Sequence, residues 1–370
     1  MNNTYITTPI YYVNDVPHVG HAYTSIACDA LARFYRLKGS DVFFLTGTDE
    51  HGLKIQQATK KKNVDTQSFV DNMSLNFQNL SKNLNLSNND FIRTTSQKHK
   101  KSVQSFWNKL VENNQIYLDK YSGWYSIRDE AFYSEDEIID GKAPSGSDVE
   151  WVEESSYFFK LSSWENNLLE FYKENPDFVK PKSRFNEVIS FVEQGLKDLS
   201  ISRTSFDWGI DVPDAEGHVV YVWIDALTNY LTALDYPDLE SNKYKNFWPA
   251  SYHIVGKDIL RFHAIYWPAL LMAAGLPLPK NIIAHGWWTV EKEKMSKSVG
   301  NVVDPNEIVN KYGLDQFRFF LLREVPFGND GDFSKTSLIS RINSELANSF
   351  GNLVNRVFSM TNKNLNGIIP

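Results

Sequence analysis

Two short motifs combine residue types that suit chemistry on a phosphate group. The first, His18-Val19-Gly20-His21, places two imidazoles three residues apart, between a predicted strand and a predicted helix. A helix start offers backbone N–H groups and its positive dipole end to a phosphate, and imidazoles donate hydrogen bonds to charge that builds during its transfer. Gly20 lets a nucleobase or a phosphate approach the backbone closely. Taken alone, the motif is equally compatible with two histidines that meet a helix start by accident.

The second motif is Lys294-Met295-Ser296-Lys297-Ser298, with Gly300 behind it. Two lysines around small hydroxyl residues suit a loop that wraps a triphosphate and neutralises diphosphate as it leaves. Taken alone, the run is more typical of a solvated basic loop, because lysines are usually exposed.

Alternating strands and helices are predicted to position both motifs. Strands are expected at residues 4–8, 42–45, 221–224, 252–255 and 282–284, and helices at 22–38, from Leu53, after Lys257 (kinked or broken at Pro268) and from Asp304-Pro305. This order predicts a doubly wound α/β fold with a parallel sheet. A turn-rich stretch at 117–152, expected to form short strands and hairpins, and helical spacing at 163–175 indicate an inserted domain. From Ser337, apolar residues at spacings of three or four predict an amphipathic helix: Ile342, Leu346, Phe350, Leu353 and Val357.

Composition narrows the class of protein. The 370 residues exceed one ordinary domain, and the net charge of -7 argues against a generally basic nucleic-acid binder without excluding a local basic face. The single Cys28 excludes an intrachain disulfide and a multi-cysteine zinc site. No signal peptide and no run of about 20 apolar residues is present, so we expect a cytoplasmic protein without membrane or DNA partners.

Together, the two motifs resemble the paired signatures of the class I aminoacyl-tRNA synthetases. The wider sequence is similar to the methionine-specific family of that class, in Thr7-Thr8-Pro9-Ile10-Tyr11-Tyr12-Val13-Asn14, Gly47-Thr48-Asp49-Glu50-His51-Gly52, Tyr221-Val222-Trp223-Ile224-Asp225-Ala226, Gly256-Lys257-Asp258 and His285-Gly286-Trp287. The resemblance implies a ligase that activates L-methionine with ATP and passes it to tRNA(Met). It also implies a Rossmann-like sheet split by a connective-peptide insertion. The implied domains are a first catalytic half (1–112), the insertion (113–220), a second catalytic half (221–308), a linker (309–336) and the start of a helical anticodon-binding domain (337–370).

The resemblance assigns roles residue by residue. His18, His21, Lys294 and Lys297 are the implied catalytic residues, and ATP is expected at Gly20, Gly256, Asp258, Ser296 and Lys297. Asp49 matches the acid that binds the substrate α-ammonium; the structural alternative is a cap for the helix that follows Gly52. The implied methionine pocket consists of Ile10, Tyr12, Asp49, Trp223, Ala226, Tyr230, Phe262, His263 and Trp267.

Aromatic residues suit a thioether, because sulfur is polarizable and favours ring edges. Tyr12 or His263 is expected to donate a weak hydrogen bond to the sulfur. The alternative is that these rings serve only to pack the hydrophobic core. For Phe262 the two roles are nearly equally supported, whereas for Trp223 and His263 the pocket role is favoured.

Two departures from the family pattern stand out. The insertion has none of the cysteines that often form a zinc knuckle there, so no structural zinc is expected, only Mg²⁺ that accompanies ATP. Trp124, Tyr125, Phe132 and Tyr133 are expected to form an apolar core instead. The chain also stops soon after the helix from Ser337, so we expect it to form methionyl-adenylate but to charge tRNA poorly.

Three competing functions stay open at the level of the residues. They are another class I synthetase, an adenylyl transferase with the same histidine chemistry, and a tRNA-binding relative without activity. The late lysine motif and the insertion argue against the second. The third has no need for His18, His21, Asp49 and Lys297 together.

Overall fold

The computed structural model describes residues 3–129, 131–295 and 300–369. The chain forms two compact units, residues 1–16 with 28–284 and residues 17–27 with 285–370. Helix α1 (Val19–Leu37) contributes its first turns to the smaller unit and the rest to the larger one.

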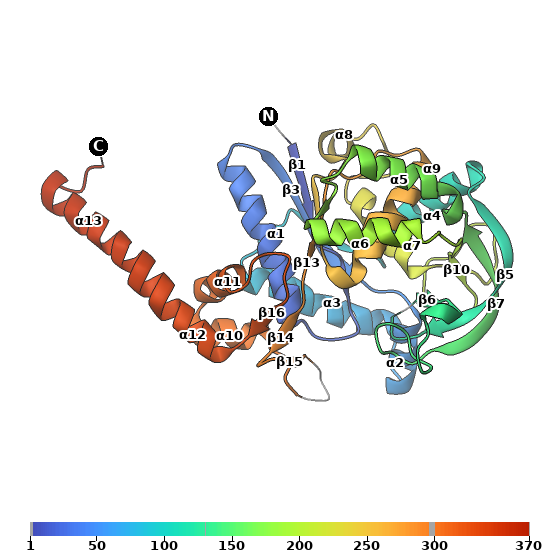
Figure 1. Ribbon diagram of the computed structural model, residues 1–370, viewed down its shortest axis with the longest axis horizontal. Helices are drawn as coiled ribbons and strands as arrows, with labels where there is room; N and C mark the ends of the chain where they lie inside the picture. The colour runs from blue at the N-terminus through green and yellow to red at the C-terminus, as the bar shows by residue number, and fades with distance from the viewer. Residues whose placement is uncertain (1–2, 130, 296–299, 370) are drawn as a thin grey trace. The chain divides into compact units, whose positions relative to one another are not determined.

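A seven-stranded sheet forms the centre of the larger unit (Figure 1). Its strand order is β2-β3-β1-β12-β13-β8, with β4 on β3, and the β1–β3, β1–β12, β3–β4 and β8–β13 pairs are parallel. The strands are β1 (Asn3–Thr7), β2 (Tyr11–Tyr12), β3 (Asp41–Asp49), β4 (Asp90–Arg93), β8 (Val179–Lys180), β12 (Tyr252–Gly256) and β13 (Ile282–His285). The predicted α/β fold is confirmed, as are the strands expected near residues 4, 42, 252 and 282.

Helices cover this sheet and bury one large apolar core. They are α2 (Leu53–Lys62), α3 (Thr66–Asn83), α4 (Gln97–Glu112), α5 (Glu165–Glu174), α6 (Lys182–Glu193), α7 (Val222–Thr232), α8 (Asn242–Phe247) and α9 (Trp267–Ala274). Side chains of Asp65 and Ser96 accept backbone N–H groups at the starts of α3 and α4, as N-cap residues do. Pro268 is the second residue of α9, directly after a π-helical turn at Phe262–Tyr266, so the helix changes its hydrogen-bonding pattern near Pro268 and does not break there.

The strand predicted at residues 221–224 is wrong. Tyr221 is the residue before α7, and the segment from Val222 onward is helical and buried on nearly every side. A short apolar run does not distinguish a buried strand from a buried helix. Here Asp225, Tyr230 and the residues between them continue the run for three turns, and that length favours a helix.

The insertion is built on a long antiparallel ribbon, so the predicted hairpin is confirmed, but its two main strands, of 11 and 10 residues, are longer than the short strands expected. Its strands are β5 (Ile116–Ser126), β6 (Ala131–Tyr133), β7 (Glu150–Phe159) and β9 (Leu199–Ser200), in the order β6-β5-β7-β9. A second pair joins β10 (Ser202–Arg203) to β11 (Val219–Val220).

The tip of the ribbon is polar, which the predicted apolar core did not anticipate. Tyr125 is buried, but the Tyr133 hydroxyl donates to Asp129 over 3.0 Å. The same carboxylate accepts from Ser126, Ser145 and Ser147. Burial opposes the charge of Asp129, yet the hydroxyl donors lower the pKa of its carboxyl. The turns at the tip therefore meet at one carboxylate.

The smaller unit combines a three-stranded sheet with helices. The sheet contains β14 (Trp288–Val290), β15 (Glu293–Lys294) and β16 (Gly331–Phe333), and the helices are α10 (Pro305–Tyr312), α11 (Leu314–Arg323), α12 (Lys335–Arg341) and α13 (Asn352–Leu365). Asp304 caps α10 as predicted, and its side chain accepts from the Asn306 N–H. A π-helical segment, Ile342–Gly351, joins α12 to α13, so the helix predicted from Ser337 is confirmed.

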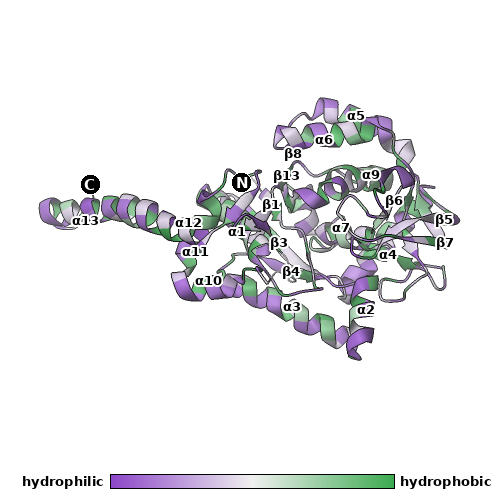
Figure 2. Ribbon diagram, turned by 60° about the horizontal axis from the view of Figure 1, so that its bottom comes forward, coloured by the Kyte–Doolittle hydropathy of each residue, from purple (hydrophilic) through white to green (hydrophobic). Residues whose placement is uncertain are grey.

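Helix α13 has hydrophobic and hydrophilic residues interspersed along its length (Figure 2). Leu353, Val357 and Phe358 of α13, and Phe350 of the π-helical segment before it, are each at least 49% exposed. Within the described part of the chain, every helix is too short or too polar to cross a membrane.

Candidate functional site

In the smaller unit, the two histidines of the first motif lie against each other at the start of α1. Their ring centroids are 3.9 Å apart. The backbone N–H of His18 donates to Nδ1 of His21, and the backbone N–H of Gly20 donates to Nδ1 of His18, both over 3.1 Å. Because each Nδ1 accepts a hydrogen bond, each ring carries its proton on Nε2. The first turn of the helix thus fixes both tautomers, with Nε2 as the donor of each ring.

The His21 ring suits a neutral donor role. Loss of solvent around the ring and the neighbouring His18 lower the pKa of His21 well below its usual value. At neutral pH His21 therefore donates one N–H without carrying a full charge. Such a donor stabilises charge that develops on a phosphate oxygen.

Gly20 is required beneath the His18 ring. A Cβ at this position would lie 2.9 Å from Cε1 and 3.1 Å from Nδ1 of His18. We expect Gly20→Ala to displace the His18 ring and to slow the adenylate formation that the resemblance implies by roughly tenfold, the scale of one lost hydrogen bond. The KM for methionine should not change. Methionine-dependent exchange of diphosphate into ATP measures both, and a wild-type rate would contradict this role of Gly20.

Thr24 and His285 form a hydrogen bond next to the same helix start. Nδ1 of His285 lies 2.8 Å from the Gly286 carbonyl and must donate to it, so Nε2 accepts from the Thr24 hydroxyl over 2.8 Å. Thr24 lies one turn beyond Gly20, and the edge of Tyr23 packs on the His285 ring. His285 is part of one of the motifs that carry the family resemblance, but no role was predicted for it from the sequence.

The second motif is only partly described. Lys294 lies in β15, where its backbone pairs with Thr289 of β14. Ser296 and Lys297 fall outside the described residues, so their predicted roles stay predictions.

In the larger unit, the predicted nucleotide residues Gly256 and Asp258 lie at the end of β12 and just beyond it. Gly256 ends the strand, and the exposed Asp258 lies in the single helical turn Lys257–Ile259. Both are at the carboxyl end of a strand in a parallel sheet. Ligands bind outside these strand ends in open α/β folds.

Asp49 ends β3 beside β2. Tyr12 is its register partner, and the Val13 N–H donates to the Asp49 carbonyl over 3.1 Å. Helix α2 begins after Gly52, which is its N-cap residue, so Asp49 does not hold the N-cap position of this helix. Asp49 and Tyr12 are both half-buried, as groups that face a small ligand would be. Ile10, just before β2, is also half-buried and packs against the apolar core that contains Tyr230 and Trp267.

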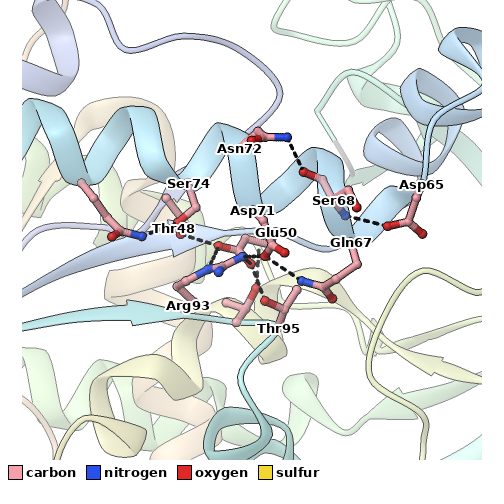
Figure 3. A network of polar contacts seen from close by, with 12 residues as sticks. Thr48, Glu50, Asp65, Gln67, Ser68, Asp71, Asn72, Ser74, Arg93 and Thr95 are labelled. Atoms are coloured by element: carbon pink, nitrogen blue, oxygen red, sulfur yellow. Dashed lines mark hydrogen bonds and ion pairs between the residues drawn. The ribbon is translucent and has the colours of Figure 1, made fainter.

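The residue after Asp49 anchors this strand end (Figure 3). Glu50 is fully buried and accepts two hydrogen bonds from Arg93, at 2.7 and 2.9 Å. Thr48 and Thr95 also donate to its carboxylate. A bidentate arginine gives a buried carboxylate a fixed orientation. Sequence reasoning gave no role to Glu50 or Arg93.

The predicted methionine pocket assembles mainly from α7 and the segment before α9. Trp223 stacks on Phe262 with centroids 3.6 Å apart and planes 5° apart. His263 meets the Trp223 ring edge-on at 6.2 Å, and Tyr230 lies between His263 and Trp267. Tyr230, His263, Trp267 and Ala226 are buried, whereas Trp223 and Phe262 are half-buried. The structure thus brings five predicted residues, Trp223, Tyr230, Phe262, His263 and Trp267, into one aromatic cluster.

Hydrogen bonding settles what His263 can donate. Nδ1 lies 2.9 Å from the Ile259 carbonyl and must donate to it, so Nε2 accepts from the Tyr230 hydroxyl over 2.7 Å. The ring then has no further N–H for a substrate sulfur. The expectation that His263 donates to the thioether is wrong for this tautomer, which leaves Tyr12 as the candidate donor.

Buried neutral histidines make stability depend on pH. Burial lowers the pKa of His263 to about 4 and holds the pKa of His253 well below its usual value. The unfolded chain binds protons below about pH 6.5, where the folded chain does not, so stability falls as pH drops from 6.5 toward 4. We expect His263 alone to cost roughly 2 kcal/mol between pH 6.5 and pH 5. Urea unfolding at both pH values measures this loss, and it should be smaller by that amount in His263→Gln.

Potential metal ligands are dispersed. Across residues 3–129, 131–295 and 300–369, no three His, Cys, Asp or Glu side chains gather as they would around a metal ion. The one cysteine, Cys28, is buried.

Comparisons with known proteins agree with this geometry. A family model described as tRNA synthetases class I (M) matches residues 4–150 and 136–358. Methionine–tRNA ligases of Rickettsia conorii and Mesorhizobium japonicum are 61% and 56% identical, over 100% and 99% of this chain and 73% and 72% of theirs. A Mycobacterium tuberculosis methionyl-tRNA synthetase in complex with methionyl-adenylate has a TM-score of 0.96 at 53% identity, covering 100% of this chain and 74% of that one. The apo form of that synthetase has a TM-score of 0.85 at 49% identity, covering 100% and 71%.

Proposed function

This chain belongs to the class I tRNA synthetases, within them to the methionine–tRNA ligases, and on that premise we propose how its residues divide the reaction. The enzyme activates L-methionine with ATP and charges tRNA. A methionine carboxylate oxygen attacks the α-phosphorus of ATP, the bond to the β-phosphate oxygen breaks, and diphosphate leaves. A ribose hydroxyl of the 3′-terminal adenosine then attacks the carbonyl carbon, and AMP leaves.

Asp49 binds the α-ammonium, and the cluster of Trp223, Phe262 and Tyr230 receives the thioether. One observation carries this assignment: His263 lies among aromatic rings, and its hydrogen bonds fix it in a neutral tautomer. A surface of neutral rings favours an uncharged, polarizable substrate side chain. A cationic or acidic substrate side chain would lose its hydration against these aromatic rings and would be rejected. Tyr12, beside Asp49, is the proposed donor to the sulfur.

In the smaller unit, His18 and His21 donate from Nε2 to phosphate oxygens of ATP, and Gly20 is a further proposed ATP contact. In the larger unit, Gly256 and Asp258 are the proposed ATP contacts. Lys294 and Lys297, with Ser296, neutralise the departing diphosphate. Mg²⁺ supplies further charge neutralisation when it enters with ATP, held chiefly by the phosphates themselves. We also propose a cytoplasmic enzyme without structural zinc, specific for tRNA(Met) in initiation and elongation, with the five domains that the sequence implied.

Amino-acid-dependent exchange of diphosphate into ATP tests the proposal. A panel should include methionine, leucine, isoleucine, valine, glutamate and lysine. Exchange with methionine alone is the expected result. Comparable exchange with leucine would reject the thioether pocket. If none of the amino acids supports exchange, the activation chemistry is rejected for this chain.

A further inference from the structure

A buried carboxylate lies between two imidazoles beside the proposed methionine pocket. Asp225 Oδ2 is 2.6 Å from Nδ1 of His51, and Oδ1 is 2.7 Å from Nε2 of His99. All three side chains are at most 2% exposed. Burial opposes the charge of Asp225, yet the two histidines hold its pKa at about 2. Asp225 is therefore a carboxylate that accepts an N–H from each ring.

The three residues come from three elements that the chain keeps far apart in sequence. His51 follows Asp49 by two residues at the end of β3, and His99 lies on α4. Asp225 lies on α7 between Trp223 and Ala226. His99 is also 3.0 Å from the Thr232 hydroxyl on α7, so α4 and α7 are joined twice.

The link matters because the proposed site has two halves. The ammonium half is the end of β3, and the thioether half is α7 with the segment before α9. Among the hydrogen bonds between described residues, the His51–Asp225 bond runs directly from the β3 loop to α7. Trp208 steadies the same loop by donating to the Glu50 carbonyl over 2.7 Å.

We infer that Asp225 is a positioning residue, which through His51 and His99 fixes the distance between the Asp49 carboxylate and the aromatic cluster and thereby selects methionine by length. This rests on the proposed function, in which Asp49 binds the ammonium. The Asp225 carboxylate is buried between the two histidines, and the proposed function assigns it no contact with the substrate. A site held to within about half an ångström needs such a second layer of buried hydrogen bonds, and loss of it loosens the geometry rather than removing a contact.

The test is Asp225→Asn in the full chain, assayed by methionine-dependent exchange of diphosphate into ATP. In this variant an amide NH₂ group, which only donates, replaces one carboxylate oxygen. It cannot accept the N–H of the histidine that faces it. We expect the KM for methionine to rise by about tenfold or more, while the KM for ATP changes less than about twofold. Equal changes in both constants, or no change in either, would overturn the inference.

Asp29→Asn is the matched control. Asp29 is also a fully buried carboxylate of the larger unit, held by Arg33 at 2.7 Å and by the backbone N–H of Ser87 at 2.7 Å, but it lies on α1. This variant should keep the wild-type KM for methionine even where its melting temperature drops. A methionine KM raised as much as in Asp225→Asn would show a general effect of a lost buried charge and would also overturn the inference.

Two substitutions of His51 decide the matter if Asp225→Asn does not fold. An asparagine places an N–H near the position of Nδ1, whereas a leucine fills space without a donor. His51→Leu should show a methionine KM about tenfold above that of His51→Asn, and equal values would refute the link. If the wild-type protein shows no methionine-dependent exchange, the proposed function is rejected and this inference with it. If the wild-type protein shows exchange but the variants do not change the KM for methionine selectively, only the inference is rejected.

Discussion

Asp49→Asn is expected to raise the KM for methionine by about 100-fold or more, because an ammonium that loses its carboxylate partner in a largely desolvated site costs about 3–5 kcal/mol. The side chain is half-buried at the end of β3, next to Tyr12. Its shape is kept by asparagine and only its charge is removed. The KM for ATP should stay within about twofold, since the ammonium contact is made only by methionine. Initial rates of diphosphate exchange at varied methionine and varied ATP give both constants.

Asp41→Asn is the control for this prediction. Asp41 begins the same strand and is exposed at its other end. It should leave both constants unchanged. A methionine KM that rises less than about threefold in Asp49→Asn would assign the ammonium to another group.

The elements around the site could be predicted where local patterns are unambiguous. The apolar run at Val42–Leu45, between Gly39 and Gly47, has the length and the borders of a buried strand, and β3 contains it. The run at Tyr221–Ile224 has the same character but belongs to α7. The difference lies in the residues that follow, since Asp225 and Asn229 are tolerated inside a buried helix only because each finds hydrogen bonds there.

The partners of the site could not be predicted from spacing. His51 and Asp225 are separated by 174 positions and His99 and Asp225 by 126, so no local pattern relates them. Glu50 was visible as part of a motif, but its bond to Arg93 exists only because β3 and β4 pair in parallel. A charged residue inside an apolar segment, as Asp225 is between Ile224 and Ala226, was the one signal that the sequence offered.

The tautomers of the histidines were likewise beyond the sequence. The motif predicts two imidazoles near a phosphate, but the direction of each donor depends on ring orientation. In the first motif, backbone N–H groups of the helix start occupy both Nδ1 atoms and leave Nε2 as the donor. In His263 the order is reversed, because a carbonyl of the preceding turn takes the Nδ1 proton. One residue type thus donates outward in one place and accepts in the other, according to the backbone group beside it.

Loss of the Nε2 donor of His21 is expected to have the second large effect, on the rate of adenylate formation. His21→Asn should slow adenylate formation by about 100- to 1,000-fold, the scale for loss of one donor to a developing oxyanion, with the KM for methionine unchanged. Asparagine still offers an oxygen near the Nδ1 position to the His18 N–H, but it places no donor where Nε2 was. His21→Gln does the opposite, because its amide nitrogen reaches the Nε2 position. The glutamine variant should therefore be at least about tenfold faster than the asparagine variant in single-turnover adenylate formation.

His218→Asn serves as the matched control for His21. His218 is half-buried in the insertion, where its ring bonds Ser202 over 3.0 Å. Its substitution should change the rate less than about twofold. If the asparagine variant of His21 is as fast as the glutamine variant, the essential feature is the acceptor at Nδ1, and His21 shapes the helix start instead of donating to the phosphate. If both variants match the wild type, the charge on the transferring phosphate is stabilised without His21.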